Sequence, residues 1–167
     1  MKIISIISML CIIACNTSKH INNSTMSFAK NQVIAHRGAW KNNNLPQNSI
    51  AALKAAIALG CAGSETDVQM TEDSALVINH DPVWGGLSVQ KSTLKELQKT
   101  KLSNGELLPL LADFLKIIRQ QTGTKLIVEI KPSGKGREWA NITVQKVVKR
   151  VQQMKAQAWV VYISFDY

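Results

Sequence analysis

Short apolar runs recur along most of the chain, and each is ended by polar or turn-forming residues. Runs of this length, rich in Val and Ile, are typical of strands buried in a sheet. The run at residues 125–130 is the clearest, because Leu, Ile and Val fill its centre and Pro132 follows closely. The predicted strands cover residues 32–35, 62–70, 75–79, 125–130 and 159–164.

Segments with helical periodicity separate most of these runs. Residues 49–59 place Ile50, Leu53 and Ile57 at helical spacing, and Gly60 follows as a stop signal. The other predicted helices cover residues 93–99, 110–121 and 137–153. Strands that alternate with helices predict an α/β fold with a parallel sheet joined by right-handed crossovers.

The start of the chain has a different pattern. Lys2 precedes an apolar run at residues 3–13, which is too short to cross a bilayer as a helix. A short positive start followed by such a run is typical of a signal peptide. We therefore predict that residues 1–14 are a signal peptide and that the protein is exported.

The residues that end this leader resemble the lipobox of bacterial lipoproteins. That resemblance implies cleavage before Cys15 and acylation of its thiol, so that a lipid anchors the protein on the periplasmic or cell-surface side of a membrane. Residues 15–32, rich in Asn and Ser, are then a flexible tether, and the folded domain covers residues 33–167. An ordinary secretory signal with an incidental cysteine is the alternative.

Composition and charge change this picture little. The chain is 46% hydrophobic and 19% charged, which is typical of a globular protein. Its net charge of +9 suits anionic partners, but the basic residues are spread along the chain. We interpret them as a solvated surface and expect no nucleic-acid partner. Cys61 is the one cysteine after residue 32, so no disulfide framework is expected there.

Polar residues fall at or near the ends of four successive predicted strands. Residues two apart in a strand point to the same face, so Glu65 projects with Asp67, and Glu129 with Lys131. Buried carboxylates need a positive partner, and a hard cation such as Ca²⁺ or Mg²⁺ prefers oxygen ligands. The residues concerned are His36, Arg37, Glu65, Asp67, His80, Glu129 and Lys131.

Functional side chains at the carboxyl ends of successive parallel strands favour a (β/α)₈ TIM barrel, whose active sites lie at that rim. An open doubly wound sheet uses fewer strands for its site. A complete barrel needs about 250 residues. We therefore expect this chain to hold the N-terminal portion of a barrel, about five of its eight strands, and to be poorly active by itself.

An ordered set of motifs resembles the glycerophosphodiester phosphodiesterase family. It extends from about residue 33 to residue 132 with the family's order and spacing. The motifs are His36-Arg37-Gly38, Pro46-Gln47-Asn48-Ser49, Glu65-Thr66-Asp67-Val68, Thr71, His80-Asp81 and Glu129-Ile130-Lys131-Pro132.

The resemblance implies a metal-dependent phosphoric diester hydrolase. Its substrate would be a small glycerophosphodiester, cleaved to an alcohol and glycerol 3-phosphate. His36 and His80 would be the general acid and base, and Arg37 and Lys131 would contact the phosphate. Glu65, Asp67 and Glu129 would hold one divalent cation, Ca²⁺ or Mg²⁺.

Some features leave alternatives open. Many family members carry Glu where this chain has Gln47, which would alter cation affinity or substrate preference. Trp40 and Trp84 follow the histidines and are candidates for the pocket wall, whereas Asp81 is expected to point away from His80 and to shape the turn. The alternative functions are a phospholipase C/D-like enzyme acting on intact lipids and a non-catalytic surface lipoprotein that binds phosphorylated ligands. The substrate alcohol, the choice of cation and the oligomeric state stay open.

Overall fold

A computed structural model describes residues 32–165 of the chain, without the side chain of Asn43. The predicted signal peptide, the Cys15 anchor and nearly all of the predicted tether lie outside these residues and stay predictions. Among the helices of the described part, none is both long and apolar enough to span a membrane.

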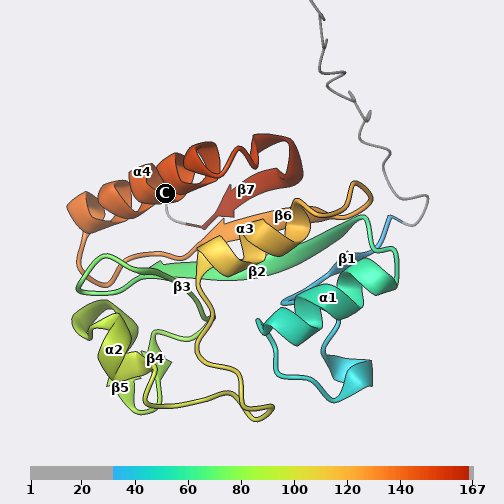
Figure 1. The fold of residues 1–167 in the computed structure, drawn as a ribbon. Coiled ribbons are helices and arrows are strands. Elements are labelled where there is room, and N and C mark those ends of the chain that lie inside the picture. The colour runs from blue at the N-terminus through green and yellow to red at the C-terminus, as the bar shows by residue number, and fades with distance from the viewer. Residues whose placement is uncertain (1–31, 166–167) are drawn as a thin grey trace, which may run out of the picture.

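Four parallel strands form the body of the sheet in the order β1-β2-β6-β7. They are β1 (Ile34–Ala35), β2 (Gly63–Met70), β6 (Lys125–Ile130) and β7 (Val160–Ser164). All four were expected as strands, and Figure 1 shows them side by side. The pairing sets Asp67 directly opposite Glu129, so the register brings acids of β2 and β6 level with each other.

The strand predicted at residues 75–79 forms as β3 (Leu76–Ile78), but it runs antiparallel to β2. Residues 71–75 make too short a link for a parallel crossover, which needs about a dozen residues or more. A backbone hydrogen bond of 2.9 Å from Thr71 to Ala75 closes this link as a turn. The main sheet therefore has four parallel strands and one antiparallel strand, rather than five parallel ones.

The predicted helices are all present. They are α1 (Ile50–Ala58), the short α2 (Leu94–Leu97), α3 (Leu111–Ile118) and α4 (Arg137–Gln153). Ser49 caps α1, because its hydroxyl accepts the backbone N–H of Ala52 at 2.9 Å. Thr93 and Glu96 form a capping box at the start of α2.

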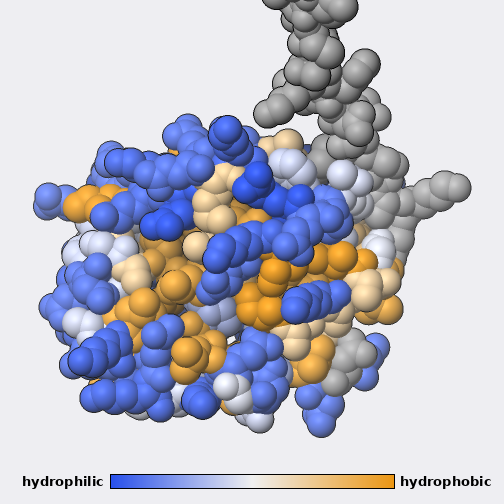
Figure 2. Space-filling model, in the orientation of Figure 1, coloured by the Kyte–Doolittle hydropathy of each residue, from blue (hydrophilic) through white to orange (hydrophobic). Residues whose placement is uncertain are grey.

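The main core lies between the sheet and its helices. Figure 1 shows α1 and α3 together on one face of the sheet and α4 alongside β7. Apolar residues of β2 and β6 pack against them, among them Val68, Leu126 and Val128. Figure 2 views this helix-bearing face, where hydrophobic residues gather across the middle, around α1 and α3. The acids of β2 alternate with the core residues, so they project from the opposite face.

A smaller lobe follows β3 in the chain. It holds the hairpin of β4 (Val83–Trp84) and β5 (Leu87–Ser88) together with α2. Trp84 packs here against a small core made of Val77, Val89, Leu97 and Leu108. The three short 3₁₀ helices, η1, η2 and η3, cover Lys41–Asn43, Val89–Lys91 and Gln157–Trp159.

Within the described residues the sheet does not close on itself: β7 forms one edge, and β1 and the short β3, which both pair with β2, form the other. Val161, Tyr162 and Ile163 of β7 are exposed. The architecture is thus an open portion of a parallel α/β sheet, with its helices on the side away from the acids.

Candidate active site

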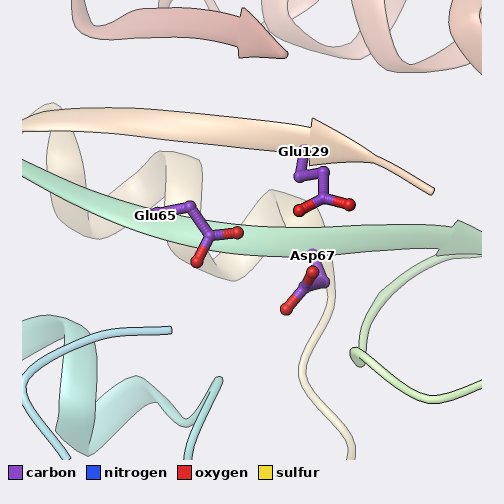
Figure 3. A group of neighbouring side chains, drawn as sticks. All are labelled: Glu65, Asp67 and Glu129. Carbon is purple, nitrogen blue, oxygen red and sulfur yellow. The ribbon is translucent and has the colours of Figure 1, made fainter. Parts of the chain in front are cut away.

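Three carboxylates meet on the helix-free face of the sheet. One ligand oxygen each from Glu65, Asp67 and Glu129 lies within 4.8 Å of the other two. Figure 3 shows the three side chains gathered on one side of β2 and β6. All are buried, with Asp67 at 0% exposure. The prediction that these three acids lie close together is confirmed.

Two oxygens of this cluster lack the partners that burial demands. Glu65 Oε1 and Asp67 Oδ1 are buried and accept no hydrogen bond from the described part of the chain. Burial raises the pKa of Glu65 to about 7, and the nearby charge of Asp67 adds to the effect. Buried oxygens without donors are costly for the protein. This donor set therefore fits a hard divalent cation, which binds oxygen ligands.

Lys131 lies against the same acids from the end of β6. Its Nζ donates to Glu129 Oε1 at 2.8 Å and is 3.4 Å from Asp67 Oδ1. Burial alone would lower the pKa of Lys131, but the hydrogen bond to Glu129 and the charge of Asp67 outweigh it and raise this pKa. Lys131 therefore remains charged beside the cluster.

Arg37 reaches the cluster from the turn after β1. Its backbone N–H donates to Glu65 Oε2 at 2.8 Å, and its Nε is 3.6 Å from Asp67 Oδ2. Its Nη1 donates to Gln47 Oε1 at 2.8 Å. Gln47 is therefore a neutral hydrogen-bond partner of the Arg37 guanidinium.

The turn that carries Arg37 has a strained backbone. Arg37 has a φ of 57°, in the left-handed region that L side chains disfavour. Gly38 follows with a φ of 82°, and a Cβ on it would stand 2.6 Å from Ala52 Cβ. Gly at position 38 is therefore required by its positive φ and by the close approach of this turn to α1.

The two histidines lie on turns outside the acid cluster. The His36 side chain is 67% exposed, and its Nε2 is 3.9 Å from Glu65 Oε2. His80 lies in the turn after β3 with its side chain 32% exposed. The side-chain amide of Gln69 donates to the backbone oxygens of Asn79 and Asp81, which fixes this turn.

The prediction for Asp81 was wrong. Its Oδ1 is 2.8 Å from His80 Nδ1, so the carboxylate faces the imidazole rather than pointing away. Alternation of side chains applies within a strand, but β3 has already ended at Ile78. Residues 80 and 81 lie in a turn, where neighbours can face each other.

The two tryptophans of the neighbouring loops differ. Trp84 lines a cavity of about 250 Å³ together with Gln47, Asp81 and Lys101. Trp40 donates its ring N–H to the backbone oxygen of His36 at 3.2 Å. The structure therefore places Trp84 beside a cavity that adjoins partners of Arg37 and His80. Trp40 supports the turn that carries His36 and lines a second cavity, of about 330 Å³, together with His36.

The sequence analysis named Asn48 within a motif but predicted no role for it at the site. This residue is 4% exposed, and its side chain bonds both Thr66 and Asp67. A helix start such as residues 48–49 commonly carries Asn as a cap, so the pattern indicated a local role. The long-range contact with β2 is visible only in the fold.

The fold and the acid cluster define a class of α/β proteins of TIM-barrel type whose site, on the helix-free face of the sheet, suits a divalent cation. Comparison with known sequences is more specific. Residues 36–166 match the model of the glycerophosphoryl diester phosphodiesterase family, and the chain belongs to this family.

Individual relatives agree with this assignment. A glycerophosphodiester phosphodiesterase of Caldanaerobacter subterraneus is 32% identical over 83% of this chain and 59% of its own length. A glycerophosphodiester phosphodiesterase from Parabacteroides distasonis, known from its crystal structure, is 38% identical in sequence to this chain. The two structures superpose with a TM-score of 0.78 over 84% of this chain and 58% of that chain. The predicted TIM-barrel fold class is thereby confirmed.

The structure of a third relative contains a bound product. The Oleispira antarctica phosphodiesterase, in complex with its product sn-glycerol-3-phosphate, is 28% identical with a TM-score of 0.66 over 84% of this chain and 61% of that chain. The present chain spans about half the length of the curated relatives that it matches, between 44% and 59% for three of them.

Proposed function

We propose that this protein is a metal-dependent phosphoric diester hydrolase that cleaves glycerophosphodiesters to an alcohol and glycerol 3-phosphate. The observation that carries the proposal is the buried cluster of Glu65, Asp67 and Glu129, flanked by Arg37 and Lys131. Family membership supports the reaction class. The bound product of the Oleispira antarctica relative supports the glycerol 3-phosphate end of the substrate.

The charges of the cluster suit a phosphodiester. Three ionised carboxylates against one guanidinium and one ammonium leave one net negative charge. A divalent cation would change this to one net positive charge, which matches the single negative charge of a phosphodiester. Ca²⁺ or Mg²⁺ held by the three acids would neutralise charge on the phosphoryl oxygens.

The basic residues would bind and orient the phosphate. The planar guanidinium of Arg37 can grip two oxygens at once, and Gln47 holds it in place through Nη1. Lys131 offers a compact positive charge from the end of β6. Both groups are already directed at the acid cluster, so the phosphate would bind where the cation lies.

The two imidazoles would move protons. One takes a proton from the attacking hydroxyl as the new P–O bond forms, and the other gives a proton to the departing alkoxide as the old P–O bond breaks. Asp81 contacts Nδ1 of His80, which leaves Nε2 of that ring for the substrate. His36 lies on the exposed turn beside Glu65 and Arg37, within reach of a ligand at the cluster.

The place of action follows from the leader sequence. We propose that the mature protein starts at Cys15 and is held by a lipid on the outer side of a membrane, where it acts on glycerophosphodiesters such as deacylated phospholipid headgroups. Expression of the full chain and of Cys15→Ser in a bacterial host tests this. Wild type should label with palmitate and sediment with membranes, and the variant should do neither.

The reaction is tested with glycerophosphocholine and the purified chain, by following the release of glycerol 3-phosphate. Turnover should stop with EDTA and return with added Ca²⁺ or Mg²⁺. Hydrolysis of intact phosphatidylcholine in micelles, without hydrolysis of glycerophosphocholine, would favour the phospholipase alternative. Because the chain alone is expected to turn over slowly, cation and phosphate binding favours the non-catalytic lipoprotein only if neither substrate is hydrolysed at high protein concentration and long incubation.

A further inference from the structure

We propose that Asn48 is a positioning residue, which aims the carboxylate of Asp67 so that one of its oxygens faces the cation. This inference rests on the proposed function, because it concerns the same cation site. It assigns a role to a buried residue that the proposed reaction leaves without one.

Asn48 lies at a junction of three elements. It directly precedes Ser49, the cap of α1, and its backbone N–H donates to the backbone oxygen of Arg37 at 2.9 Å. Its side chain reaches β2. The residue is 4% exposed, so water does not compete with these contacts.

The orientation of the Asn48 amide is determined by its donors. Its Oδ1 accepts the hydroxyl of Thr66 at 2.9 Å and the backbone N–H of Asp67 at 3.3 Å. A backbone N–H can only donate, so the atom facing it has to be the amide oxygen. The amide nitrogen then faces the Asp67 carboxylate, and Nδ2 donates to Oδ2 at 2.7 Å.

This arrangement divides the two oxygens of Asp67 between different tasks. Oδ2 accepts from Asn48 and lies 3.6 Å from Arg37 Nε. Oδ1 is buried without a hydrogen bond in the described part of the chain and lies 3.4 Å from Lys131 Nζ. Oδ2 is hydrogen-bonded by Asn48, whereas Oδ1 has only the Lys131 ion pair in the described part of the chain and is the oxygen that we assign to the cation.

Few other residues can do this at position 48. The backbone φ is 57°, which Gly, Asn and Asp tolerate best. Gly has no amide to donate, and Asp would set a carboxylate against that of Asp67. Asn alone among the three both accepts from β2 and donates to Asp67.

The test measures binding of Ca²⁺ and Mg²⁺ to the full 167-residue chain by calorimetry. Asn48→Gly keeps the backbone conformation and removes the amide. We expect its Kd for the cation to rise about ten- to a hundred-fold, the usual effect of losing a partner that orients a metal ligand. Asn48→Asp should weaken binding at least as much, because its carboxylate repels Asp67.

Ser49→Ala is the matched control. It removes the adjacent helix cap, which also lowers stability, but in the described part of the chain the Ser49 hydroxyl is hydrogen-bonded to Ala52 N–H and to none of the acids. Its cation Kd should stay within about two-fold of wild type, against the larger change expected for a ligand-orienting partner. If Ser49→Ala weakens binding as much as Asn48→Gly does, the role of Asn48 is general stability and the inference is wrong.

The double variant Asn48→Asp with Asp67→Asn separates folding from positioning. In it the new carboxylate accepts from the new amide, so the hydrogen bond returns with its direction reversed. We expect the metal-free unfolding midpoint to recover toward wild type while the cation does not bind, because the acid is lost from β2. No recovery of the midpoint would contradict the pairing of these two side chains.

The outcomes also separate this inference from the proposed function. If the wild-type chain binds neither Ca²⁺ nor Mg²⁺, the proposed cation site itself is wrong. If wild type binds and Asn48→Gly binds equally well, the site stands and only the positioning role of Asn48 fails.

Discussion

The acids and the histidines of the candidate site are held in opposite ways. Glu65, Asp67 and Glu129 stand on two hydrogen-bonded strands in fixed register and are buried. His36 and His80 lie on turns, with side chains 67% and 32% exposed. Sheet register fixes the acids without help from a ligand, whereas the position of each imidazole depends on its turn. Cation binding should therefore survive changes to the histidines, while turnover should need both regions.

Loss of a central acid should have the largest effect. Asp67→Asn removes a negative charge from a fully buried position and puts an amide against the Nδ2 of Asn48. Since loss of an orienting partner alone costs about 10- to 100-fold in metal affinity, we expect at least about a 100-fold rise in the cation Kd. Calorimetry measures the Kd, and turnover of glycerophosphocholine should fall with it. The exposed Glu138→Gln, on α4, is the charge-matched control and should change neither.

Loss of either imidazole should abolish most turnover and spare the cation. His36→Ala and His80→Ala remove a proton-transfer group, which typically lowers the rate about 10²- to 10⁴-fold. Neither ring donates to the acids, and the shortest contact is the 3.9 Å from His36 to Glu65. The cation Kd should therefore stay close to wild type. A parallel loss of cation binding in both variants would contradict the separation of the two regions.

The metal-free protein should lose stability as the pH rises toward neutrality. Burial and the charge of Asp67 raise the pKa of Glu65 to about 7. In the window between the ordinary Glu value and about 7, the folded state holds a proton that the unfolded state has released. The free energy of unfolding should therefore fall as pH rises through this window, by about 3 kcal/mol in total.

Urea unfolding in EDTA between about pH 4 and about pH 8, a range that spans this window, measures the slope. Excess Ca²⁺ or Mg²⁺ should restore stability at the high end, because a cation replaces the proton at the acids. Glu65→Gln should remove both the slope and the cation effect. A slope that is unchanged in Glu65→Gln would assign the titration to another group.

The sequence predicted the strand-borne half of this site better than the turn-borne half. Glu65, Asp67 and Glu129 could be assigned to one face because side chains alternate regularly along strands. The orientation of Asp81 could not be predicted in this way, because Asp81 lies in a turn beyond the end of β3, where side chains do not alternate regularly. The role of Asn48 at the site was missed for a related reason, because its contact with β2 depends on how a loop packs rather than on local pattern.

The same limit applies to the fold. The helices and strands were predicted because periodicity is local, and the α/β class followed from their alternation. The predicted direction of β3 was wrong. The antiparallel return depends on the short turn between Thr71 and Ala75, and the apolar pattern of the strand carries no information about it. Long-range pairing therefore needed the structure.

Asp81 offers the finest test of the turn-borne half. Asp81→Asn keeps the size of the side chain but replaces the carboxylate that faces His80 Nδ1. An amide can present either its oxygen or its nitrogen to the ring, so the tautomer that leaves Nε2 for the substrate is no longer enforced. The contact is largely exposed, and we expect kcat to fall only about ten-fold, below the usual range for losing the imidazole itself. KM and the cation Kd should stay unchanged, and the pH profile of kcat should shift. If Asp81→Asn leaves both kcat and its pH profile as in wild type, the carboxylate shapes the turn and has no part in proton transfer.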